Sequence, residues 1–235
     1  MKTSSEQMAM FEKADARRCV LRYVNEGNSL CDEAEVAMLG LKDFLEVYRT
    51  YIRNYSLCSV AQLKLFELPN AKELLKEYIE QNYPLCESSQ AKMLGLFDAE
   101  ELINIYVEKH ALSPKAQIKL LKHPNAEKLL KIYVQYHYLS DEAELKMIEH
   151  EKHERFIAIY LQEHYLGEKA EVKLMETTNK EVVLQYIAKS SPLCKKAQIK
   201  MVERKDAQEL VKAYTQLHYL DDEAKFRMFE LSQGV

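Results

Sequence analysis

Residues 112–138 read LSPKAQIKLLKHPNAEKLLKIYVQYHY, and the next stretch, residues 139–165, reads LSDEAELKMIEHEKHERFIAIYLQEHY. Leu, Ala, Lys, Tyr and a final His-Tyr pair recur 27 residues apart. Self-similarity at a fixed period of about 20–50 residues is the signature of a repeat protein. A Leu opens each repeat along the chain, and a small residue follows four positions later. These leucines are Leu30, Leu57, Leu85, Leu112, Leu139, Leu166, Leu193 and Leu220.

The composition favours helices and excludes some classes of partner. Among 235 residues there are only five Gly and five Pro, while helix-forming residues dominate. The formal net charge is −4, so no overall positive field attracts nucleic acid or an acidic membrane surface. No apolar run approaches the roughly 18–20 residues of a membrane helix, so we expect no membrane partner. Five cysteines, an odd count, suit a reducing cytoplasm.

Each repeat is predicted to hold two helices. The first begins after the opening Leu, at a residue that caps well, such as Ser140. The second carries apolar residues at helical spacing, which predicts one buried face. Its predicted N-caps are Asp15, Asp43, Asn70, Asp98, Asn125 and Asp206, with Thr178 in the seventh repeat and the poorly capping Lys152 in the sixth.

The sequence therefore predicts an all-α fold. We expect an alpha-alpha solenoid, or superhelix, of about eight 27-residue two-helix repeats plus a terminal half repeat, in one elongated domain over residues 1–235. The frame Leu-x3-Ala-x3-Leu/Met, a polar turn, Asn/Asp-Ala-x2-Leu-Leu and an aromatic residue resembles leucine-rich-repeat-variant and HEAT-like repeats. The resemblance implies stacked helices and transfers no catalytic residue. The Asn-Pro linkers and Val-Arg pairs usual in those variants are not regular here.

Two periodic sets of side chains admit alternative interpretations. The Tyr ladder could stack nucleic acid bases, but it lies within the apolar stripe, so we favour a core role. Its members are Tyr23, Tyr51, Tyr78, Tyr106, Tyr133, Tyr160, Tyr186 and Tyr214. The Lys ladder could bind a polyanion. We favour ion pairs between repeats, such as Lys119–Glu144 and Lys146–Glu171 or pairs in the reverse direction. A Glu or Gln stands two residues before each lysine, which places it on the opposite side of the first helix. The Lys ladder is Lys64, Lys92, Lys119, Lys146, Lys173, Lys200 and Arg227.

Histidine and cysteine also recur. A zinc site would need further ligands, and a His at a helix C-terminus is favoured by the helix dipole, so we expect no metal and no cofactor. The histidines are His110, His137, His164 and His218. Cysteines at the first-helix N-cap could be reactive, but a small residue replacing Ser explains them better. They are Cys31, Cys58, Cys86 and Cys194. No catalytic constellation is visible, so we expect no enzyme.

The position before the ladder Tyr is polar in the N-terminal repeats and apolar in repeats four to six. There it holds Ile105, Ile132 and Ile159, and Tyr136 extends the same face one turn later. Such a patch can mark a partner site, although tighter packing between repeats would also explain it. We therefore predict a non-enzymatic scaffold that binds a protein or peptide partner. The alternative is a HEAT-like solenoid that binds nucleic acid through the Lys ladder, with or without base-repair activity.

Overall fold

The computed structural model describes residues 2–96, 99–177, 179–189 and 192–233. Within these residues the chain forms helices and no strand. The first helices of the repeats are α1 (Ser4–Phe11), α3 (Asp32–Leu39), α5 (Ser59–Leu65), α7 (Glu87–Met93), α9 (Pro114–Leu121), α11 (Asp141–Ile148), α13 (Glu168–Met175), α15 (Lys195–Val202) and α17 (Asp222–Ser232). The second helices are α2 (Ala16–Asn25), α4 (Leu45–Ile52), α6 (Ala71–Glu80), α8 (Ala99–Val107), α10 (Ala126–Val134), α12 (His153–Tyr160), α14 (Lys180–Lys189) and α16 (Ala207–Thr215).

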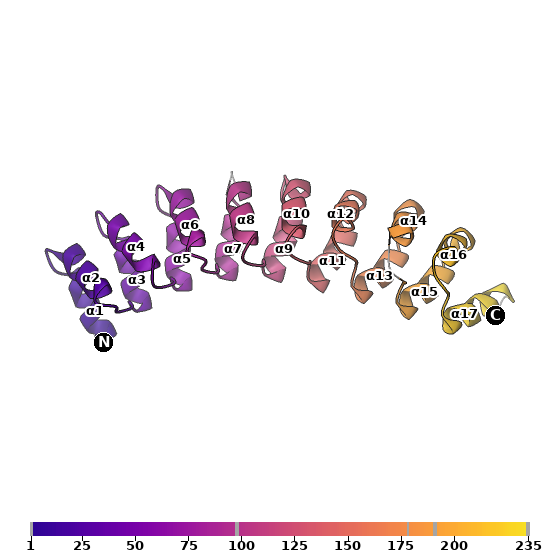
Figure 1. Ribbon diagram of the computed structural model, residues 1–235, viewed down its shortest axis with the longest axis horizontal. Coiled ribbons are helices and arrows are strands. Elements are labelled where there is room, and N and C mark those ends of the chain that lie inside the picture. Colours follow the sequence, from indigo (N-terminus) through magenta and orange to yellow (C-terminus); the bar gives the residue numbers. More distant parts are fainter. Residues whose placement is uncertain (1, 97–98, 178, 190–191, 234–235) are drawn as a thin grey trace. The chain divides into compact units, whose positions relative to one another are not determined.

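The chain divides into two compact units, Met1–Ala116 and Gln117–Val235. In each unit the first helices form one row and the second helices form another (Figure 1). In the N-terminal unit α1, α3, α5 and α7 pack in succession, and in the C-terminal unit α11, α13, α15 and α17 do the same. The fold is thus an α-solenoid of two-helix repeats with a terminal half repeat, as predicted. A single domain over residues 1–235 stays a prediction.

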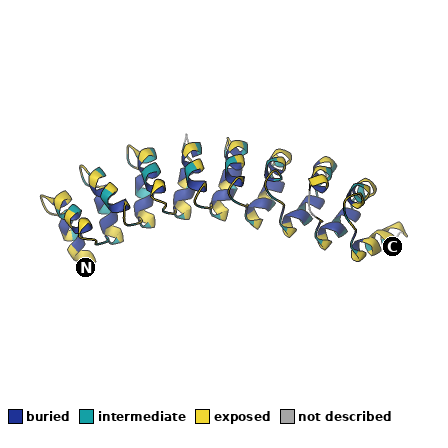
Figure 2. Ribbon diagram, in the orientation of Figure 1, coloured by how far each residue is buried: buried dark blue, intermediate teal, exposed yellow. Residues whose placement is uncertain are grey.

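Buried residues lie where the two rows face each other, and exposed residues lie on the outer faces (Figure 2). Every member of the Tyr ladder is buried, which confirms the predicted core role. The opening Leu and the small residue four positions later are also buried in repeats 2 to 8, as at Leu139 and Ala143. Because these side chains recur at one period, each repeat offers its neighbour the same apolar surface.

The Thr, Ser and Asp residues at first-helix N-caps make capping bonds as predicted, whereas the predicted caps of the second helices do not. Ser140 Oγ accepts a hydrogen bond from the Ala143 N–H at 3.3 Å. By contrast, Asn70 and Asn125 stand at the N-cap without a side-chain hydrogen bond. The Lys128 N–H, which an Asn125 side-chain cap would accept, donates to the Asn125 carbonyl at 3.1 Å instead. A backbone bond therefore replaces the side-chain cap.

The same correction holds for other predicted caps of second helices. Asp15 and Asp206 are at the N-cap but make no capping bond with their side chains. Asp43 is displaced from the N-cap, which is Phe44. The poor cap predicted at Lys152 is confirmed, because its side chain makes no capping bond. Asp98 and Thr178 lie outside the described residues.

Candidate functional site

The most regular polar feature is a buried row of Glu and Gln side chains on the first helices. Each has an exposed fraction of 4–6 %. We call this row the Glu/Gln ladder, and it consists of Gln7, Glu35, Gln62, Gln90, Gln117, Glu144, Glu171 and Gln198. The sequence pattern had suggested that such residues pair with lysines of neighbouring repeats. That interpretation is wrong for Glu144 and Glu171, because both carboxylates bond to tyrosine and backbone groups instead.

A glutamine in this ladder joins two repeats. Gln62 Nε2 donates to the Tyr78 hydroxyl at 3.2 Å and to the Leu57 carbonyl at 3.0 Å. Its Oε1 accepts the Cys86 N–H at 2.7 Å. Cys86 is the N-cap of the next first helix. The side chain therefore links the second helix of its own repeat to the start of the following repeat.

Every ladder member receives such a bond from the next repeat. The eight donor–acceptor distances lie between 2.5 and 2.9 Å, and the donors are the N–H groups of Cys31, Cys58, Cys86, Ser113, Ser140, Gly167, Cys194 and Asp221. A first-helix N-terminus leaves N–H groups unpaired, and a buried donor without a partner is costly. The ladder satisfies one of these groups in each following repeat.

A glutamate in the ladder reverses one hydrogen bond. The Tyr160 hydroxyl donates to Glu144 Oε1 at 2.7 Å, and the Gly167 N–H donates to Oε2 at 2.9 Å. Burial raises the pKa of the Glu144 carboxyl, and the two hydrogen bonds to the carboxylate oppose that rise. Burial likewise raises the pKa of Glu35. These carboxylates serve packing between repeats and leave no open side for a substrate.

Most lysines of the Lys ladder pair with a Glu of the same repeat, at the end of the same first helix. Lys64, Lys146 and Lys200 each lie 2.7–3.0 Å from a Glu three residues later. Lys173 has a similar partner at 3.5 Å, and the Lys92 ammonium lies 5.9 Å from the Phe66 ring centroid. Two members reach the preceding repeat: Lys92 approaches Phe66 at the end of α5, and Arg227 lies 3.0 Å from Glu203, which follows α15. The predicted pair between Lys146 and Glu171 is therefore wrong, and most of these charges face a nearby carboxylate.

The recurring histidines stack on the Tyr ladder. The ring centroids of His110 and Tyr106, and likewise of His164 and Tyr160, are 5.2 Å apart. Tyr55 occupies the same position in repeat 2, and its ring lies 5.2 Å from Tyr51. This shared aromatic character was the signal that sequence reasoning missed.

One histidine also bonds to a helix end. His164 Nε2 lies 2.6 Å from the Val134 carbonyl, at the C-terminal end of the preceding second helix. This bond is to the preceding second helix, so the predicted role of His164 at the end of its own helix stays a prediction. Among the described residues, no group of three or more His, Cys, Asp and Glu could hold a metal.

Two of the N-cap cysteines, Cys58 and Cys194, are not activated thiols. Burial raises the pKa of Cys58 to about 11, and Glu35 beside it acts in the same direction. The pKa of Cys194 is raised for the same reasons, with Glu171 as the neighbour. Cys58 Sγ accepts the Ala61 N–H at 3.4 Å, as a Ser cap would. This is the structural role that the sequence favoured.

The predicted partner patch lies partly in each compact unit. Ile105 belongs to α8 in the N-terminal unit, whereas Ile132 and Ile159 lie on the packed helices α10 and α12 of the C-terminal unit. The three isoleucines are half-buried, and Tyr136 is 46 % exposed. In repeat 3 the same position holds Glu77, which pairs with Arg49 at 2.7 Å.

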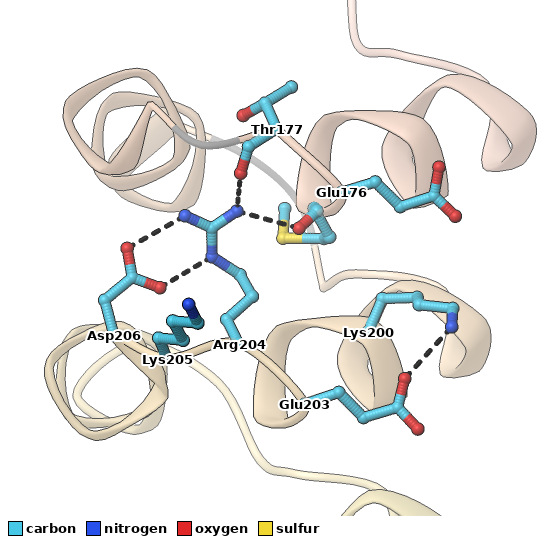
Figure 3. Close-up of a pocket in the computed structure, with 8 residues that line it drawn as sticks. Glu176, Thr177, Lys200, Glu203, Arg204, Lys205 and Asp206 are labelled. Carbon is cyan, nitrogen blue, oxygen red and sulfur yellow. Dashed lines mark hydrogen bonds and ion pairs between the residues drawn. The ribbon is translucent and has the colours of Figure 1, made fainter.

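In a cleft beside the loops of repeats 7 and 8, several of the lining groups bond to one another. Figure 3 shows the Arg204 guanidinium between the Asp206 carboxylate and backbone carbonyls of the preceding repeat. It lies 2.7 and 2.8 Å from the two Asp206 oxygens, 2.8 Å from the Met175 carbonyl oxygen, and also donates to the Thr177 carbonyl. The Arg204 side chain is only 10 % exposed. Arg204 therefore joins two repeats and is not available to a ligand.

Sequence reasoning also missed three exposed tyrosines in the C-terminal unit. Tyr138, Tyr165 and Tyr219 directly precede the opening Leu of their repeats, and 70, 58 and 97 % of each residue is exposed. Their shared position was visible as the Tyr of the recurring His-Tyr-Leu sequence.

In comparisons with protein-family models, curated proteins and solved structures, the chain matches none of them. No helix in the described ranges is long and apolar enough to cross a membrane. The functional argument therefore starts from the surface of the repeats.

Proposed function

We propose that this protein is a non-enzymatic scaffold that binds a protein or peptide partner. The observation that carries the proposal is the apolar character of Ile132 on α10, Tyr136 just after α10, and Ile159 on α12. A position needed only for packing would keep one character in all repeats. Instead it holds a paired Glu77 in repeat 3 and half-exposed isoleucines in repeats 4 to 6. Apolar surface of this kind is typical of partner sites.

The finer assignment is also a proposal. The repeat frame supports a HEAT-like or leucine-rich-repeat-variant solenoid, and free thiols at all five cysteines suit the cytoplasm. Ile105, at the equivalent position of repeat 4 in the N-terminal unit, is a further proposed contact residue. Nucleic-acid binding has weaker support, because carboxylates next to most of the Lys ladder lower its positive potential.

The test compares Ile132→Asp with Gln185→Asp in affinity capture from the source cells. Gln185 holds the equivalent position in repeat 7 and is exposed, so it controls for an added negative charge on a second helix. We expect a partner that is retained by the wild type and Gln185→Asp and lost with Ile132→Asp. Melting temperatures should be similar, because surface changes usually shift stability by less than about 0.5 kcal/mol. A large drop in melting temperature for Ile132→Asp would assign the residue to the core and refute the patch.

A further inference from the structure

The residue that precedes each opening Leu differs between the two compact units. In the N-terminal unit it is small or Pro, namely Ser29, Ser56, Pro84 and Ala111. In the C-terminal unit it is Tyr138, Tyr165, Pro192 and Tyr219. We call the three tyrosines the linker Tyr row. Because Ser or Ala completes the same linker elsewhere, the solenoid does not need an aromatic ring at this position.

The tyrosines of the linker Tyr row are largely exposed to water, with exposed fractions of 58–97 % for the whole residues. Tyrosine is enriched at protein interfaces, because its rigid ring gives a large contact area and loses little conformational entropy. The restriction of exposed rings to one unit therefore points to binding rather than to folding.

Tyr138 is held in place before any partner arrives. The Tyr133 hydroxyl donates to the Tyr138 carbonyl at 3.3 Å, which fixes the backbone. The Tyr138 ring centroid lies 4.1 Å from that of His164, and His164 is itself bonded to the Val134 carbonyl. One side of the ring is thus supported while 70 % of the residue stays exposed. Such preorganisation lowers the entropic cost of binding.

The spacing of the row matches a polyproline II helix. Helices α11, α13, α15 and α17 pack in succession, and packed helices lie about 8–10 Å apart. A polyproline II helix rises about 3.1 Å per residue with three residues per turn, which gives about 9.3 Å per turn. A proline at every third residue would therefore meet successive linkers. Aromatic side chains are the usual surface on which such peptides dock.

The charges beside the row favour a basic peptide. Exposed carboxylates follow the tyrosines by three or four residues, at Glu142, Glu168 and Glu223. Lys195 and Lys196 follow Pro192 instead. Lys169 follows Tyr165 and pairs with Asp141 at 3.0 Å, but carboxylates still outnumber cations three and four residues after the three tyrosines. Arg or Lys residues near the prolines would pair with these carboxylates.

We propose that the linker Tyr row binds a proline-rich peptide with basic residues, in the polyproline II conformation. The inference rests on the proposed protein-binding function for its general class, but it uses different residues from the patch at Ile132. It also commits to the chemistry of one partner, which the proposed function does not.

Fluorescence anisotropy of a labelled synthetic peptide with the full chain tests the proposal. The peptide has Pro at every third residue over four turns and two Arg residues, and a scrambled peptide of the same composition is its control. We expect saturable binding at micromolar concentration for the first peptide and at least tenfold weaker binding for the second. Tyr138→Ser with Tyr165→Ser should weaken binding at least tenfold without lowering the melting temperature, since Ser56 holds this position in repeat 2.

Two further variants separate the possible outcomes. Tyr136→Ser removes an exposed tyrosine outside the row and should leave peptide affinity unchanged. Ile132→Asp should also bind the peptide normally, even if it loses the partner captured from cells, so each proposal can fail without the other. Equal binding of the scrambled peptide, undiminished binding by the double variant or no saturable binding would each overturn the inference.

Discussion

Glu144→Gln should stabilise the protein at neutral pH, although it removes two charge-assisted hydrogen bonds. The adjacent repeat gives the template for the variant. Gln117 Nε2 donates to the Tyr133 hydroxyl at 2.9 Å, and its Oε1 accepts the Ser140 N–H at 2.7 Å. A Gln at residue 144 can make the same bonds to the Tyr160 hydroxyl and the Gly167 N–H.

The expected gain follows from burial and from one extra hydrogen bond. A carboxylate has no proton to donate, whereas Gln62, Gln90 and Gln198 also donate to the carbonyl of the opening Leu at 2.8–3.0 Å. A typical net hydrogen bond contributes about 0.5–1.5 kcal/mol, and the amide also avoids burying a negative charge. The loss of the two charge-assisted hydrogen bonds offsets part of this gain in the free energy of unfolding. We expect the free energy of unfolding to rise by about 1–2 kcal/mol at pH 7.5.

The gain should depend on pH in a defined direction. The pKa of Glu144 is raised in the folded state, so the folded chain holds this proton more tightly than the unfolded chain. The stability that Glu144 contributes is therefore fully present below the pKa that its carboxyl has in the unfolded chain. It is lost as pH rises through the raised pKa of the folded chain. The advantage of Gln should shrink as pH falls towards about 4, where the Glu144 carboxyl is mostly protonated in the folded and in the unfolded chain.

Urea unfolding at pH 7.5 and at pH 4 measures both effects. Glu149→Gln, at the C-terminal end of the same helix, is the matched control, because Glu149 is exposed and pairs with Lys146 at 2.7 Å. Loss of that exposed pair should cost at most about 1 kcal/mol. If Glu144→Gln were destabilising at pH 7.5, the hydrogen bonds to the carboxylate would outweigh its desolvation. A gain that is the same at both pH values would also contradict the reasoning.

The opposite substitution, Gln117→Glu, should lower the free energy of unfolding by about 1–2 kcal/mol at pH 7.5 and by less at pH 4, in the same urea experiment. Arg204→Met should cost about 2–4 kcal/mol in urea unfolding, because it leaves Asp206 and two backbone carbonyls without a buried donor; no loss of stability would show that the guanidinium is dispensable. Cys58, with a pKa of about 11, should react with iodoacetamide at pH 8 at least tenfold more slowly than a free cysteine, as measured by mass spectrometry of the labelled peptide.

The period in the sequence was enough to predict the fold and the core. The Tyr ladder lies within the 3.6-residue apolar stripe of the second helices, so helical geometry alone placed it inside. The partners of the Glu/Gln ladder could not be placed in this way. Helical geometry showed only that these residues leave the first helix on the side opposite the Lys ladder. The groups on that side are the Tyr hydroxyl of the second helix and the N-cap N–H of the next repeat. Their positions depend on how the helices pack, which the sequence pattern does not give.

A signal for the ladder was nevertheless present in the sequence. The position holds Gln in five repeats and Glu in three, so its constant feature is an acceptor oxygen and not a charge. An ion pair would require the charge in every repeat. Likewise, Lys64 and Glu67 stand three residues apart, which predicts a pair on one side of the helix end. The predicted cap at Asn125 failed because a backbone carbonyl had already satisfied the Lys128 N–H.

The contrast between constant and variable positions separates folding from function in this chain. The buried Tyr and the Glu/Gln acceptor recur in every full repeat, because each repeat must bond to the next in the same way. Positions outside that requirement are free to differ between repeats. Ile132 and Tyr138 stand at two such positions, and both are apolar or aromatic only in part of the array. Selection for solubility alone would place small or polar residues there, as Ser56 shows in repeat 2. Binding is the requirement that accounts for a local change of character without a change of fold.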